Sequence, residues 1–193
     1  MKPASTLPVP QKANWSRHTV LLVPLAFLLL VCSIASVGFA SPQPQDATSR
    51  RMSELNSMAA RSTSANPAKT LEYGNEALKL AITLKNLEAQ SVALLNIRLA
   101  HLQLGNLSQT KYALDGSLTA AQQAGYRKGM SDAHNFLGTY YWEEGLYDQA
   151  HKHYTQAVAI RGELKDRIGM SKSINNLGQV QRKIGNYEKA IDH

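Results

Sequence analysis

Apolar residues recur every three to four positions in the second half of the chain, the spacing of amphipathic helices. One such stripe lies within residues 130–144, and a second lies within residues 147–162, after Gly145. The stripes consist of Ala133, Leu137 and Tyr141, and of Ala150, Tyr154, Ala157 and Val158. The spacing predicts two helices that fold back on each other at the glycine. The small residues Gly138, Ala150 and Ala157 are expected to let the two backbones approach closely.

The sequence repeats itself at a shift of 40 residues from about Asn66 onward. The residues that align include Gly105, Gly145 and Gly185; Ser91, Ser131 and Ser171; and Ile97, Leu137 and Leu177. A helical hairpin cannot bury its apolar face alone, so successive copies are predicted to stack into a solenoid. The predicted units are about 47–86, 87–126, 127–166 and an incomplete 167–193.

The later copies resemble the tetratricopeptide repeat. The matching residues are Leu137, Gly138, Tyr141, Gly145, Tyr147, Ala150, Tyr154 and Ala157, and then Leu177, Gly178, Gly185, Asn186, Tyr187, Glu188 and Ala190. The longer period resembles a long-helix variant found in kinesin light chains and in input regions of bacterial signalling proteins. The resemblance implies an all-α fold over residues 52–193, a right-handed α-solenoid of about three and a half antiparallel hairpins. Met58 stands where later units have glycine, so the first copy is a degenerate or capping repeat.

The resemblance also implies a concave groove lined by the first helix of each hairpin. Its positions here are Leu95, Leu99, Asn135, Thr139, Asn175 and Gln179, flanked by Asp132, Lys172, Trp142 and Arg182. Side-chain amides can pair with the backbone of an extended peptide because they both donate and accept. Asn175 and Asn176 have an alternative role, which is to tie adjacent hairpins together. The family's charged clamp for a carboxyl-terminal carboxylate is absent.

Residues 1–40 predict export. Three basic residues and no acidic ones precede or flank the apolar run Val20–Val31, and the small-x-small triplet ending at Ala40 precedes Ser41. This pattern is typical of a cleaved signal peptide; the alternative is a retained signal anchor that tethers the protein through Val20 to Val37. Either outcome makes the body periplasmic or extracellular, secreted or anchored in the inner membrane. Residues 41–51 are predicted to be a polar linker.

The amino-acid composition excludes several kinds of site and partner. Cys32 is the one cysteine, so an internal disulfide and a multi-cysteine metal site are excluded. Three of the 21 Lys and Arg residues but none of the 14 acidic residues fall in residues 1–40, so the body is only mildly basic and no nucleic-acid partner is expected.

No catalytic, metal or cofactor site is predicted. His151 and His153 point to opposite sides of a helix and cannot share an ion. Glu143 and Glu144 likewise diverge, and residues 125–129 read as a turn between repeats rather than a phosphate-binding loop.

The functional hypothesis is therefore a non-catalytic scaffold that binds a protein or extended peptide. The alternative is the sensory input part of a larger membrane signalling enzyme, a histidine kinase or nucleotide cyclase, with further domains downstream. A last helix is predicted to begin near Tyr187 and to stop at His193 after about two turns, so either the chain is a fragment or a partner completes the repeat.

Overall fold

The computed structural model describes residues 44–62 and 65–191, with side chains up to residue 185. This part of the chain contains seven helices and no strand. The helices are α2 (Pro44–Ser62), α3 (Pro67–Thr83), α4 (Leu87–Gln103), α5 (Leu107–Ala124), α6 (Arg127–Glu143), α7 (Tyr147–Glu163) and α8 (Arg167–Ile191). The predicted all-α class is confirmed. Helices α4, α6 and α8 begin at residues 87, 127 and 167, where the predicted units begin.

The helices start and stop where the sequence provides caps and turns. The side chains of Asn66 and Asn86 accept hydrogen bonds from the first turns of α3 and α4. Gly105 and Gly145 follow α4 and α6 with φ of 73° and 74°, a left-handed conformation that glycine adopts without steric cost. These glycines close the hairpins α4–α5 and α6–α7, as predicted.

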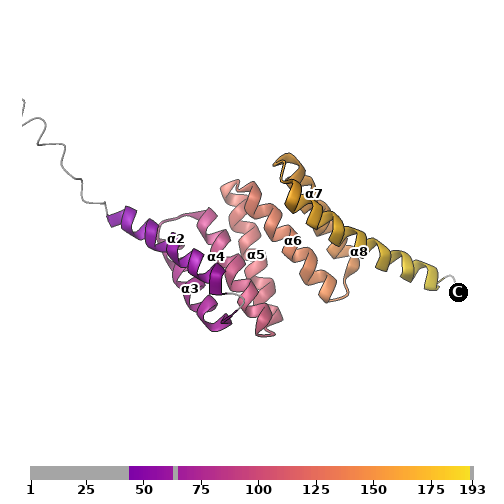
Figure 1. The fold of residues 1–193 in the computed structure, drawn as a ribbon, viewed down its shortest axis with the longest axis horizontal. Coiled ribbons are helices and arrows are strands. Elements are labelled where there is room, and N and C mark those ends of the chain that lie inside the picture. The colour runs from indigo at the N-terminus through magenta and orange to yellow at the C-terminus, as the bar shows by residue number, and fades with distance from the viewer. Residues whose placement is uncertain (1–43, 63–64, 192–193) are drawn as a thin grey trace, which may run out of the picture. The chain divides into compact units, whose positions relative to one another are not determined.

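The helices pack in chain order, each against the next, in an antiparallel row (Figure 1). Helices α2, α4, α6 and α8 also contact one another in turn, because α2 touches α4, α4 touches α6 and α6 touches α8. Among the described helices, α3, α5 and α7 make no such second-neighbour contacts. The row therefore curves, with the first helix of each hairpin on its inner face, as expected for a helical-repeat solenoid.

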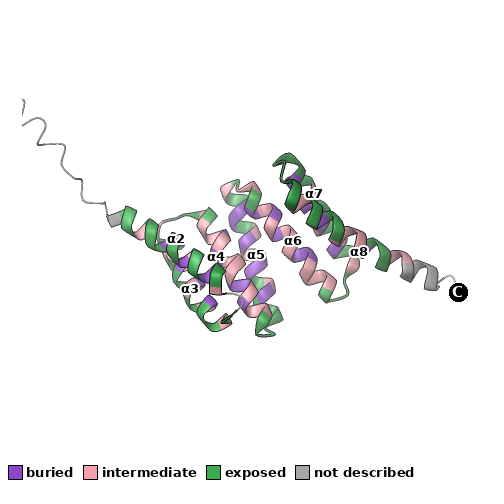
Figure 2. Ribbon diagram, viewed as in Figure 1, coloured by how far each residue is buried: buried purple, intermediate pink, exposed green. Residues whose placement is uncertain are grey.

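Small buried residues form the core between the helices, and the buried positions follow one stripe along each helix (Figure 2). Leu55, Ala77 and Ala93 form one buried cluster. A Cβ atom built on Gly138 would lie 2.7 Å from the Tyr154 ring, so this glycine lets α6 and α7 approach each other as predicted.

Helix α8 overturns one prediction. The expected turn at Gly185 and second helix from Tyr187 are absent, because α8 runs without interruption from Arg167 to Ile191. In earlier units, the helix after the turn is at least 17 residues long and buries a full apolar stripe. The continuous helix keeps the main-chain hydrogen bonds around Gly185 that a turn would interrupt.

The predicted linker needs a second correction. Helix α2 begins at Pro44, so residues 44–51 belong to the first helix rather than to a linker. Most of them are nevertheless exposed, which explains why no hydrophobic periodicity revealed the helix. The predicted signal segment, its cleavage site before Ser41 and Cys32 lie outside the described residues. No helix in the described part of the chain is long and apolar enough to cross a membrane.

Candidate binding surface

The inner face of the row carries a trough across α2, α4 and α6. One hollow of about 260 Å³ lies between these three helices, and a second of about 390 Å³ lies between α2 and α4. Both hollows are lined by Ala60, Val92 and Asn96, so they are continuous. We call this combined depression the amino-terminal trough. Its walls include the predicted groove residues Leu95 and Leu99, which are half-buried.

A third hollow, of about 250 Å³, lies at the other end of the row, between α6, α7 and α8. We call it the carboxyl-terminal hollow. Its lining includes three predicted groove residues, Thr139, Trp142 and Gln179, together with Asn176. The Thr139 hydroxyl accepts a hydrogen bond of 3.1 Å from the Tyr154 hydroxyl, which fixes it on the floor of the hollow.

Two other predicted groove residues, Asp132 and Asn135, are engaged in a buried polar network centred on Arg161. Arg161 is 6% exposed and donates to one Asp132 oxygen at 2.9 Å, to the Gly169 carbonyl at 2.8 Å and to the Ser173 hydroxyl at 2.6 Å. The Ser173 hydroxyl in turn donates to the Asn135 side-chain oxygen at 2.8 Å. The network joins α6, α7 and α8, so Asn135 ties hairpins together, the role that the sequence had suggested for Asn175 and Asn176.

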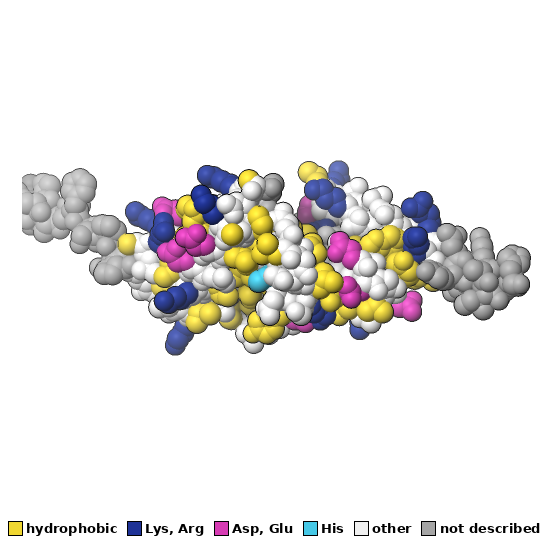
Figure 3. Space-filling model, turned by 90° about the horizontal axis from the view of Figure 1, so that it is seen from below, with side chains coloured by type: hydrophobic (Ala, Val, Ile, Leu, Met, Phe, Trp, Pro, Cys, Tyr) yellow, Lys and Arg dark blue, Asp and Glu magenta, His cyan; other side chains and the backbone are white. Residues whose placement is uncertain are grey.

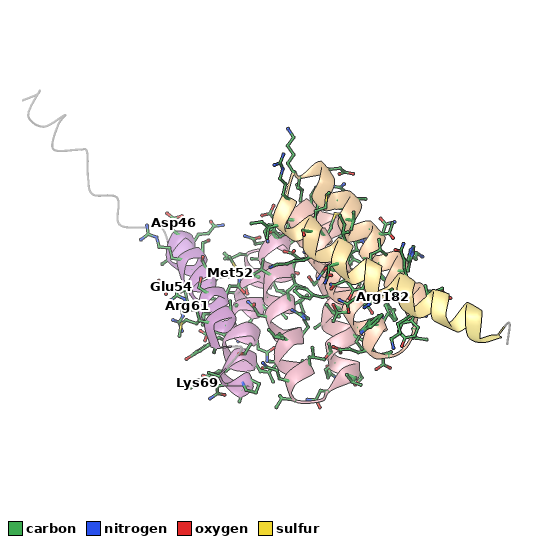
Figure 4. The ribbon with its side chains drawn as sticks, turned by 45° about the vertical axis from the view of Figure 1, so that its right-hand side comes forward. Asp46, Met52, Glu54, Arg61, Lys69 and Arg182 are labelled. Carbon is green, nitrogen blue, oxygen red and sulfur yellow. The ribbon has the colours of Figure 1, made fainter. Side chains whose placement is uncertain are left out.

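The remaining predicted residues, Lys172, Asn175 and Arg182, are exposed on α8 (Figure 4 labels Arg182). None of the three lines the trough or the carboxyl-terminal hollow. The structure thus gathers Leu95 with Leu99, and Thr139 with Trp142 and Gln179, but leaves Lys172, Asn175 and Arg182 apart from both.

Arg98 is a residue of the trough that sequence reasoning missed. It is 7% exposed, and its guanidinium carbon lies 3.4 Å from the centre of the Phe136 ring. Within the described part of the chain it has no hydrogen-bond or ion-pair partner, and its Nε is buried and unsatisfied. Burial lowers the pKa of Arg98 to about 10, partly offset by the more distant charges of Asp132 and Glu143. Arg98 therefore stays charged at neutral pH.

The rim of the trough beside Arg98 carries Lys128. Its ammonium donates to the second Asp132 oxygen at 2.8 Å, and this hydrogen bond raises the pKa of Lys128. The two oxygens of Asp132 thus accept hydrogen bonds from Lys128 and Arg161, and Asp132 makes no hydrogen bond to Arg98. Three cations surround one carboxylate here, so the floor of the trough is electropositive.

The family comparison addresses the carboxyl-terminal third of the chain. Residues 129–193 match the family described as tetratricopeptide repeat. This part of the chain carries tetratricopeptide repeats. Among solved structures, the apo form of RapI is similar to this chain over 91% of the chain's length, with a TM-score of 0.66 and 16% sequence identity. The chain spans 62% of that structure, and the likeness concerns the fold. No curated protein matches the sequence.

The tetratricopeptide register contains the signal that could have revealed Arg98. At successive shifts of 40 residues, the position of Arg98 is occupied by Met58, Arg98, Gly138 and Gly178. The residues two positions earlier are Asn56, Asn96, Phe136 and Asn176. Arg98 and Phe136 are each a departure from the repeat, and the structure brings the two departures into contact.

The structure pairs His153 with His134 and not with His151, the histidine considered beside it in the sequence. His153 lies opposite His134 of α6, with their Nδ1 atoms 3.0 Å apart, and His151 takes no part. One imidazole donates its Nδ1 hydrogen to the other, so the pair is stable only when at least one ring is neutral. In the described part of the chain, no group of three or more His, Cys, Asp and Glu residues could hold a metal ion.

Charged side chains do not form one basic stripe on the face drawn in Figure 3. Lys and Arg side chains lie at several separate places on that face, with acidic side chains between them and hydrophobic ones across the middle. This distribution gives no support to nucleic-acid binding, which needs clustered cations.

Proposed function

We propose that the repeats form a non-catalytic scaffold that binds an extended segment of a partner protein in the amino-terminal trough. The observation that carries the proposal is the continuity of two hollows across three inner helices. A surface that crosses several helices suits an elongated ligand better than a compact one. Tetratricopeptide repeats and other solenoids use such inner faces for binding.

The trough also offers groups that suit a peptide backbone. The Asn96 side chain donates to the Asn56 carbonyl at 3.2 Å, which holds its amide across the floor between α4 and α2. The Asn56 side-chain oxygen is buried and has no partner among the described residues. A peptide N–H group could supply the missing donor, since buried acceptors are rarely left unpaired. The apolar walls formed by Val92, Leu95 and Leu99 would then receive peptide side chains.

The carboxyl-terminal hollow extends this surface. Thr139 and Gln179 provide hydroxyl and amide groups there, and Trp142 provides an aromatic wall. These residues can bind a continuation of the same segment. Thr139, Trp142 and Gln179 therefore keep the groove roles that were predicted for them. Asn135 has no such role in the proposal because its side-chain oxygen is occupied by Ser173 and Arg161.

Selection of displayed random dodecapeptides on the full chain tests the proposal. We expect peptides that compete with one another for one site. Ala60→Trp fills the trough at a residue that lines both hollows, and should weaken binding at least about tenfold by excluding the peptide from its walls. Ala159→Trp, at an exposed position of α7, is the matched control and should bind normally. Failure to select any peptide, or equal binding by Ala60→Trp, would contradict the proposal.

We further propose that the scaffold acts outside the cytoplasm, secreted or anchored in the inner membrane. The support is the basic start, apolar run and small-x-small triplet within residues 1–40. The amino-terminal sequence of the protein purified from its own cells is the test. A mature chain beginning at Ser41 and located outside the cytoplasm supports export with cleavage, whereas an intact chain in the cytoplasm contradicts it.

A further inference from the structure

The guanidinium of Arg98 is the described cation of the trough that lacks an anion. Burying a charge is costly unless a partner compensates it, and Arg98 is 7% exposed. Phe136 covers one face of the guanidinium, but a ring face cannot accept the in-plane N–H groups. Of the three guanidinium nitrogens, only Nε is both buried and unpaired, so the two outer nitrogens keep some exposure. Arg98 lines the trough and also a small space towards Glu143.

The surrounding residues do not supply the missing acceptor. Asp132 lies on the same hollow, but its two oxygens are held by Lys128 and Arg161. Glu143 lines a space of about 10 Å³ that Arg98 and Phe136 also line, and it makes no hydrogen bond to Arg98. One more negative charge in the trough would balance Arg98.

We propose that Arg98 binds the side-chain carboxylate of an aspartate or glutamate within an extended peptide, an inference that rests on the proposed function. The planar guanidinium fork matches the two oxygens of a carboxylate. The walls beside it are the apolar side chains of Leu95, Leu99 and Phe136, which suit the stem of an acidic side chain.

The position of Arg98 favours a side chain within the peptide over a free chain end. On one side of Arg98 the trough continues over α4 to α2 through Asn96. The trough also extends to the first turn of α6, where Lys128 and Gly129 line it. The space on the Glu143 side of Arg98, about 10 Å³, is too small for a peptide chain. A bound chain therefore has room to continue past the guanidinium within the trough itself.

Peptide selection on the full chain and on matched variants is the first test. On the wild-type chain, selected dodecapeptides should share an aspartate or glutamate at one fixed position. Arg98→Met, which introduces the residue found at the corresponding position 58, should still select peptides but without the shared acidic residue. Arg182→Met removes the same charge from an exposed site and should retain it. Acidic enrichment that persists in Arg98→Met, or is absent from the wild-type selection, would overturn the inference.

A second measurement on the wild-type chain does not depend on the folding of any variant. In the best selected peptide, replacing the shared glutamate by glutamine should weaken binding at least about tenfold, because a charged hydrogen bond becomes a neutral one. Amidating the carboxyl terminus of that peptide should change binding little. The opposite pattern would assign Arg98 to a chain end, and loss below about twofold in both comparisons would remove it from the site.

If no peptide is selected, the proposed function fails and the anion site is tested alone. Blocked glutamate, blocked glutamine and inorganic phosphate are titrated at equal ionic strength while the Arg98 Nε–H resonance is followed by nuclear magnetic resonance. A saturable shift with blocked glutamate only would support the carboxylate site without a peptide scaffold. No shift, or a larger shift with phosphate, would overturn it.

Discussion

Arg98 of α4 lies over the ring of Phe136 of α6, with 3.4 Å between the guanidinium carbon and the ring centre. Each residue departs from the 40-residue repeat. The later units have Gly138 and Gly178 in place of the arginine, and the other units have asparagine in place of the phenylalanine. The contact joins two successive inner helices at the trough. It places a buried charge where the other repeats have small or unbranched apolar residues.

A double-mutant cycle of Arg98→Met and Phe136→Leu should show that these two residues are coupled. We expect an interaction free energy of about 1 kcal/mol, the range of a partly desolvated cation–π contact. Arg98→Met alone should change the free energy of unfolding little, because it removes a buried unpaired charge together with its packing. Urea denaturation measures all four proteins, and additive single effects would show that the contact carries no energy.

The network around Arg161 should be important for stability. Arg161→Ala removes the cation that holds Asp132, Ser173 and the Gly169 carbonyl, and leaves these polar groups partly buried without their donor. Breaking such a buried pair costs about 3 kcal/mol. Arg167→Ala, at an exposed position, should cost less than about 0.5 kcal/mol. Equal denaturation midpoints for the two variants would show that the network does not stabilise the packing of α8.

Two helical glycines provide a matched test of close packing. A Cβ on Gly138 would meet the Tyr154 ring at 2.7 Å, whereas a Cβ on Gly178 would meet nothing within 4 Å. Gly138→Ala should therefore destabilise the protein by about 1–3 kcal/mol through overpacking. Gly178→Ala should stabilise it by about 0.5–1 kcal/mol, because alanine is the better helix former. Thermal unfolding measures the stability of both variants. A stabilising effect of Gly138→Ala would contradict the observed packing.

The hairpins could be predicted from the sequence because their signals are local. Helical periodicity around Leu137 and Tyr154, together with the turn at Gly145, determines each hairpin without knowledge of the rest. The 40-residue register then predicts which helices are neighbours. Helix α2 was missed before residue 52 because its exposed first turns carry no apolar stripe.

The candidate site was less predictable because its interactions depend on side chains from three or four helices. The position of Asn135 on an inner helix is visible in the sequence, but its engagement by Ser173, 38 residues away, is not. Arg98 was missed for the opposite reason, because its signal is a departure from the repeat and not an agreement between copies. Whether such a departure is compensated becomes visible only when Phe136 is placed beside it.

The uninterrupted path of α8 predicts opposite effects at two aligned glycines. Gly145 has φ of 74°, so Gly145→Ala forces alanine into a left-handed conformation and should cost about 1 kcal/mol. Gly185 lies within α8, and a Cβ atom built on it would meet nothing within 4 Å, so Gly185→Ala should instead stabilise the helix by up to about 1 kcal/mol. Circular dichroism during urea unfolding measures both. A destabilising Gly185→Ala would indicate a turn at this position.

The paired histidines predict that stability falls in mild acid. Burial, then the neighbouring charge of His134, lowers the pKa of His153 to about 4, and burial also lowers the pKa of His134. The folded state thus prefers neutral rings, while the unfolded chain takes up protons below its pKa of about 6.5. Stability from the pair is therefore complete above about pH 7, declines as the pH falls towards 4, and changes no further below that. The loss should be about 1 kcal/mol, since the half-exposed pair is screened by solvent.

His153→Gln isolates this effect from the titration of carboxylates. The difference in unfolding free energy between pH 7 and pH 4.5 should be about 1 kcal/mol smaller in His153→Gln than in the wild-type chain. His151→Gln alters a neighbouring histidine but leaves the 3.0 Å contact between His134 and His153 intact, so it should behave as the wild type. An identical pH dependence in all three proteins would mean that the imidazoles titrate in the folded chain as they do in the unfolded one.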